Sequence, residues 1–111
     1  MKSGQFWEET ACQYLTQQGL RLVTRNWRCR GGEVDLIMRD TDALVFVEVK
    51  YRSQTQFGSA VEAVTARKLH RMRQTARHFL SETKSMAKEY RFDVVAIEGG
   101  RIHWLKGVTN Q

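Results

Sequence analysis

The sequence has no proline among its 111 residues and only two cysteines. It also has no internal repeat and no low-complexity segment, so nothing marks a linker between two domains. Cys12 and Cys29 lack the spacing of a zinc site, and they do not form the cysteine framework of a small secreted domain. We therefore expect one compact domain, residues 1–111, whose two thiols are reduced.

Long hydrophobic runs are missing as well. No apolar stretch approaches the roughly 20 residues that a membrane-spanning helix needs. The first ten residues, MKSGQFWEET, lack the apolar segment of a signal peptide and carry acidic residues early. These absences favour a soluble protein of the cytoplasm that has no membrane partner.

Acidic residues are in the minority, with 12 Asp and Glu against 18 Lys and Arg, which gives a net charge of +6. The excess is greatest between residues 50 and 91, where ten basic residues accompany three acidic ones. A basic surface favours a polyanionic partner, and nucleic acid is the commonest candidate. Charge alone does not separate such a partner from a surface that is merely solvated.

The first predicted element is a helix over residues 3–18. Ser3 can cap its start and Gly19 can close its end. At 100° per residue one face collects Phe6, Trp7, Thr10, Ala11 and Tyr14, with Leu15 at its border. We expect this face to pack on the rest of the domain.

Strands are predicted at 20–27, 33–39 and 44–51, and their short connections imply an antiparallel meander. A second helix over 60–82 follows, with Leu69, Met72, Ala76, Phe79 and Leu80 on its apolar face. Strands at 91–97 and 101–105 end the chain. The order αβββαββ predicts an α/β fold in which helices flank a mixed sheet.

The second and third strands allow a register to be predicted. If paired residue numbers sum to 83, Asp35 lies opposite Glu48 and Glu33 lies opposite Lys50, all on one face with β-carbons ~5 Å apart. Ile37 and Phe46 continue that face as core. The other face is apolar, which supports the register, and it collects Val34, Leu36, Met38, Val45, Val47 and Val49.

Facing carboxylates repel each other, and a hard divalent cation such as Mg²⁺ relieves the repulsion. A lysine beside them can orient a water molecule and offset phosphate charge. Asp35, Glu48 and Lys50 therefore form the minimal set for metal-assisted phosphodiester hydrolysis. The alternative is a ladder of cross-strand ion pairs in which the two carboxylates are simply solvated. The flanking apolar positions and the basic helix that follows favour the catalytic interpretation.

The two strand segments read GEVDLI at residues 32–37 and VFVEVKYR at residues 45–52. They resemble the signature of the small bacterial YraN-like proteins, which are described as endonuclease-like and placed within the PD-(D/E)XK restriction-endonuclease-like fold. The resemblance runs nearly end to end. Its other matching residues are Gly4, Glu8, Ala11, Arg25, Asn26, Trp27, Gly58, Lys68, Arg91, Phe92 and Asp93.

This resemblance implies roles for individual residues. Asp35 and Glu48 would be ligands of Mg²⁺ or Mn²⁺, helped by the backbone carbonyl of Val49, and Lys50 would be the catalytic lysine. Glu8 matches an acidic residue that archaeal-type Holliday junction resolvases place near their metal site. Trp7 stands where the family usually has glycine, so a solvated Glu8 remains the alternative.

Several neighbouring residues have two interpretations. Glu33 could bind metal, although an ion pair with Lys50 or Arg52 is preferred. Trp27 and Trp104 could stack on bases, although core packing is preferred. A basic group could bind DNA phosphates or form a solvated face, and it consists of Arg52, Arg67, Lys68, Arg71 and Arg77.

The sequence thus predicts a magnesium-dependent endonuclease that acts on branched or otherwise non-duplex DNA. The substrate class comes from the resemblance to resolvases, which cut symmetric junctions as dimers, and a homodimer is an analogy of the same kind. The rival hypothesis is a nucleic-acid-binding module that keeps a nuclease-like fold without catalysis.

Overall fold

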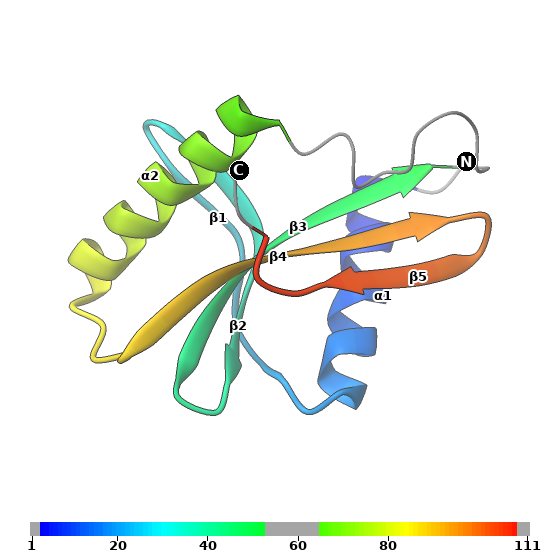
Figure 1. Cartoon of the computed structure of the whole chain (residues 1–111), viewed down its shortest axis with the longest axis horizontal. Coiled ribbons are helices and arrows are strands. Elements are labelled where there is room, and N and C mark those ends of the chain that lie inside the picture. The colour runs from blue at the N-terminus through cyan, green and yellow to red at the C-terminus, as the bar shows by residue number, and fades with distance from the viewer. Residues whose placement is uncertain (1–2, 53–64, 109–111) are drawn as a thin grey trace.

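The computed structural model describes residues 3–52 and 65–108, and these form two helices and five strands (Figure 1). In chain order they are α1 (Gly4–Gln17), β1 (Arg21–Cys29), β2 (Gly32–Asp40), β3 (Ala43–Arg52), α2 (Ala66–Thr83), β4 (Glu89–Glu98) and β5 (Arg101–Leu105). The predicted order is confirmed. The predicted first turns of the second helix, from residue 60, and the motif residue Gly58 lie outside the described residues.

All five strands belong to one sheet in the order β1-β2-β3-β4-β5. The pair β3–β4 is parallel, and the other three pairs are antiparallel. A parallel pair requires a crossover connection, and α2 lies in the segment that joins β3 to β4 (Figure 1). The predicted α/β fold with a mixed sheet is therefore confirmed.

The two helices cover different faces of the sheet, because each packs in its own hydrophobic cluster. The cluster beneath α1 contains Ala11, Cys12, Leu15, Leu36, Met38, Val45, Val47, Val95 and Ile97. The cluster beneath α2 contains Val34, Ile37, Leu44, Phe46, Leu69, Met72, Ala76, Phe79 and Phe92. Within the described part of the chain, neither helix is long and apolar enough to cross a membrane.

Helix α1 begins and ends as predicted but packs on a slightly different face. The Ser3 hydroxyl accepts a hydrogen bond from the Phe6 amide at 3.2 Å, and Gly19 adopts the left-handed φ of 103° that ends the helix. Phe6 is 42% exposed, whereas Cys12 and Leu15 are buried. The predicted face had Phe6 as a member and Leu15 at its border, and it is corrected to a face that includes Cys12 and Leu15 and leaves Phe6 exposed.

The predicted hairpin register is confirmed over the paired residues of β2 and β3, which run from Asp40 with Ala43 to Leu36 with Val47 and whose numbers all sum to 83. Beyond Leu36 the ladder gives way to a side-chain contact, in which the Val49 amide donates to Asp35 Oδ2 at 2.8 Å. The carboxylate of Asp35 thus satisfies a backbone donor at the point where the two strands stop pairing.

One residue of the hairpin faces the other way. Val34 packs in the α2 cluster with Ile37, whereas the prediction placed it with Leu36. Val34 lies directly opposite Trp27 of β1, and Trp27 packs against the same cluster.

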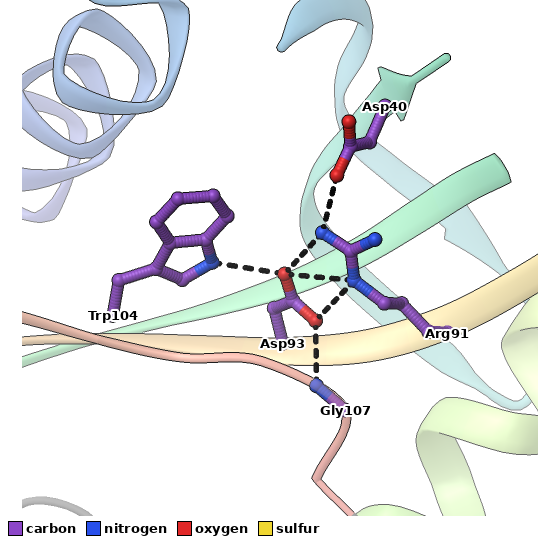
Figure 2. A network of polar contacts seen from close by, with 5 residues as sticks. All are labelled: Asp40, Arg91, Asp93, Trp104 and Gly107. Carbon is purple, nitrogen blue, oxygen red and sulfur yellow. Dashed lines mark hydrogen bonds and ion pairs between the residues drawn. The ribbon is translucent and has the colours of Figure 1, made fainter. Parts of the chain in front are cut away.

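The late motif Arg91-Phe92-Asp93 builds a buried polar network (Figure 2). Asp93 is fully buried and accepts hydrogen bonds from Arg91, from Trp104 Nε1 at 2.9 Å and from the Gly107 amide at 3.0 Å. Arg91 also pairs with Asp40 at 3.0 Å. The network joins the β2–β3 turn, β4 and the chain after β5, so this motif stabilises the fold.

Candidate active site

Asp35 and Glu48 line the same pocket of about 230 Å³, between the β2–β3 hairpin and α2. The remaining lining residues are Gly31, Gly32, Glu33, Lys68, Arg71 and Met72. Gly32 allows α2 to approach closely, because a β-carbon there would lie 3.0 Å from Thr75 Oγ1. The structure therefore brings together the two carboxylates that the register placed on one face.

The environment of Asp35 opposes its ionisation. Burial raises the pKa of its carboxyl group to about 7, and the negative charge of Glu48 acts in the same direction. The hydrogen bond from the Val49 amide favours the charged form but does not outweigh these two effects. The ionised form of Asp35 therefore lacks sufficient positive compensation in the pocket.

Two lysines contact the carboxylate of Glu48. Lys50 Nζ lies 3.4 Å from Glu48 Oε2, and Lys68 Nζ forms a closer ion pair with the same oxygen. Burial lowers the pKa of Lys68, and the charge of Lys50 adds to this, against the opposing effect of Glu48. Lys50 thus lies beside the carboxylate pair, as the strand register predicts.

Glu8 lies outside this pocket. It is partly buried on α1 and lines a second pocket with Ser3, Gln5, Phe6, Glu9, Arg25 and Asn26. Its charge still contributes to the raised pKa of Asp35. The Trp7 ring stacks on Tyr51 with centroids 3.8 Å apart, so the bulky residue packs on β3.

The donor set of the main pocket suits a hard divalent cation. Asp35 and Glu48 supply carboxylate oxygens from adjacent strands, and Mg²⁺ is commonly held by one or two carboxylates with water and phosphate oxygens completing its shell. Across residues 3–52 and 65–108 no group of three or more His, Cys, Asp or Glu is placed to hold a metal ion. Glu8 therefore does not complete a three-carboxylate site in this conformation.

Comparison with known protein families shows which family the chain belongs to. The profile of the uncharacterised protein family UPF0102 matches residues 7–97. The chain belongs to this family. It is 48% identical over 105 residues to a UPF0102 protein of Aeromonas hydrophila, covering 93% of this chain and 81% of the relative. It is 49% identical over 107 residues to one of Shewanella frigidimarina, covering 96% and 98%.

Among solved structures, a repair endonuclease from Pyrococcus abyssi resembles this UPF0102 chain with a TM-score of 0.47 and 20% sequence identity. The matched region covers 88% of this chain and 39% of that protein. This likeness is too remote to bear on activity. The family membership, in contrast, confirms the YraN-like resemblance that the strand motifs indicated.

Glu33 pairs with a residue that the sequence did not suggest. Arg28 Nε lies 2.9 Å from Glu33 Oε2, and these residues are directly opposite in the β1–β2 register. The prediction of a partner in Lys50 or Arg52 is therefore wrong. It failed because the β2–β3 pairing ends at Leu36 and Val47, before Glu33 could face Lys50.

The basic residues of this family member divide into two groups. Arg67, Arg71 and Arg77 are exposed on α2, as the helical phase predicts, and Arg52 is half-buried at the end of β3. Lys68 instead turns into the pocket and pairs with Glu48. Lys68 was predicted to bind DNA phosphates or to be solvated, yet its spacing to the buried Met72 and Thr75 already indicates the inner face of the helix.

Both tryptophans that could have stacked on bases are used in packing. Trp27 meets Phe79 edge to face with centroids 5.3 Å apart, and Trp104 donates to Asp93. The preferred interpretation of each as a packing residue agrees with these contacts.

Proposed function

We propose that this UPF0102 protein is a metal-dependent endonuclease that hydrolyses phosphodiester bonds in DNA. The observation that carries the proposal is the pocket in which Asp35 and Glu48 meet, with the pKa of Asp35 raised to about 7 by burial and by Glu48. Such a perturbed carboxylate in a cleft is typical of functional sites, because stability alone does not favour it. A bound divalent cation would remove the conflict.

Asp35 and Glu48 would hold Mg²⁺ or Mn²⁺, with the backbone carbonyl of Val49 as a third donor. When bound, the metal ion would polarise the scissile phosphate. Lys50 would orient the attacking water molecule and offset charge on the phosphate, which its position 3.4 Å from Glu48 Oε2 supports. The water oxygen would bond to phosphorus and lose a proton to solvent, while the phosphorus–oxygen bond of the leaving strand breaks and its oxygen takes up a proton from solvent.

The proposed substrate is branched or otherwise non-duplex DNA. This part of the proposal rests on the motif resemblance to resolvases. The exposed Arg67, Arg71 and Arg77 of α2 would track the phosphate backbone, since Arg71 also lines the pocket.

The test is a cleavage assay on a panel of end-labelled four-way junctions, flaps, single strands, duplexes and RNA. Each substrate is incubated with Mg²⁺, Mn²⁺ or a chelator. We expect metal-dependent cleavage of a branched or single-stranded DNA, reduced at least 100-fold in Asp35→Asn and retained in Asp42→Asn, which changes an exposed turn residue. DNA binding without cleavage in either metal would instead support the catalytically idle module.

A further inference from the structure

Lys68 is bound to one of the two proposed metal ligands. Its Nζ contacts Glu48 Oε2 closely, and Lys50 Nζ lies 3.4 Å from the same oxygen. The Glu48 side chain is only 11% exposed, so few other approaches to that carboxylate are available. One of the two proposed ligands is therefore already bound to a cation supplied by the protein.

The helix holds this cation in place. Thr65 caps α2 and accepts a hydrogen bond from the Lys68 amide at 3.1 Å, while Leu69 and Met72 anchor the same turns in the core. Arg71 lines the same pocket one turn later, but it is exposed, and no ion pair joins it to Glu48 in the described part of the chain. Lys68 and Arg71 thus share a pocket and differ in whether they contact the carboxylate.

We propose that Lys68 is a tethered cation that holds Glu48 until a divalent cation displaces it. The proposal rests on the proposed function only in taking Glu48 as a metal ligand. An ammonium group and a divalent cation on one carboxylate oxygen repel each other strongly in a partly buried pocket. Metal binding therefore moves the Lys68 ammonium off Glu48, where it becomes available to a phosphate group. Lys68 is thus a positioning residue: it competes with the metal ion for Glu48 and thereby weakens metal binding.

The test measures Mn²⁺ binding to metal-free protein by isothermal titration calorimetry, without DNA. We expect Lys68→Met to bind Mn²⁺ at least fivefold more tightly than the parent protein, and Lys68→Arg to stay within twofold of the parent. Arg71→Met is the matched control, because it removes one positive charge from the same pocket without vacating Glu48. It should also stay within twofold.

Equal or weaker Mn²⁺ binding by Lys68→Met would overturn the proposal, as would undetectable binding in every variant. An equal gain in Arg71→Met would overturn it too, because net charge would then explain both. If Lys68→Met does not fold, Lys68→Gln carries the same test, since its amide can still donate to Glu48 without a charge. Tighter binding by the variant in a protein that never cleaves DNA would refute the endonuclease and leave this inference standing.

Discussion

Asp35 is held where its ionisation is unfavourable. The pKa of about 7 in the folded protein compares with an ordinary value of 3.8, because burial and Glu48 both favour the neutral form. The folded state therefore binds more protons than the unfolded state between these two values. The contribution of neutral Asp35 to the stability of the fold is fully present below about pH 4 and is lost as the pH rises towards 7. The pKa difference between the folded and unfolded states corresponds to at most roughly 4 kcal/mol of unfolding free energy.

The first prediction at this scale concerns Asp35→Asn without metal. At pH 8 the substitution should stabilise the protein by about 1–4 kcal/mol, because it removes the buried charge and keeps an acceptor for the Val49 amide. The gain should shrink towards zero near pH 4. Urea unfolding at several pH values measures it, with Asp42→Asn as the control. A stability difference that does not vary with pH would contradict the electrostatic explanation.

At the scale of secondary structure, the apolar pattern predicted most of the arrangement. The alternation of apolar residues in the β2–β3 hairpin predicted the correct strand register, and the stripe of apolar residues on α2 predicted the buried face of that helix. The apolar pattern did not predict the side-chain contacts that β2 makes with the neighbouring strand β1. Val34 packs with Trp27 of β1 in the cluster beneath α2, and the register with β1 places Glu33 opposite Arg28. Neither effect is visible in the sequence of β2 alone.

The exposed face of α2 leads to a prediction about DNA binding. Arg67→Ala combined with Arg71→Ala should weaken binding to all DNA sequences and lower the slope of log affinity against log salt by about 2, one per lost phosphate contact. The stability should change by only about half a kcal/mol per site, because both side chains are exposed. Salt titrations of binding to a labelled four-way junction measure the slope.

The matched control for this face is Arg21→Ala combined with Arg101→Ala. Both arginines are exposed, on β1 and β5, and the control removes the same charge from elsewhere on the surface. It should leave the salt slope within experimental error of the parent protein. If the α2 variant and the control behave alike, the basic face of the helix is merely solvated.

For the molecule as a whole, the carboxylate that holds the fold together and the carboxylates of the candidate site are different residues. Asp93 is completely buried, with partners from β4, from β5 and from the chain after it (Figure 2). Asp35, in contrast, lines an open pocket and forms no ion pair within the described residues. The sequence motifs marked both residues without separating these roles, because separating them requires the contacts that only the assembled sheet provides.

We therefore predict that Asp93→Ala destabilises the protein by about 3–5 kcal/mol, since it leaves the charged Arg91 and two partly buried donors without their acceptor. Denaturant unfolding measures the loss. Mn²⁺ affinity should remain unchanged at temperatures where the variant is folded. A loss below about 1 kcal/mol would show that Asp40 and water replace the lost contacts.

The central claim is that Asp35 and Glu48 together bind one divalent cation. A crystal structure of the protein soaked in Mn²⁺, with anomalous scattering used to locate the metal, tests it most directly. We predict a single strong peak about 2.0–2.2 Å from an oxygen of each carboxylate, with the Lys68 ammonium moved away from Glu48. A pocket without a peak at saturating Mn²⁺, or a peak bound to only one of the two residues, would contradict the account.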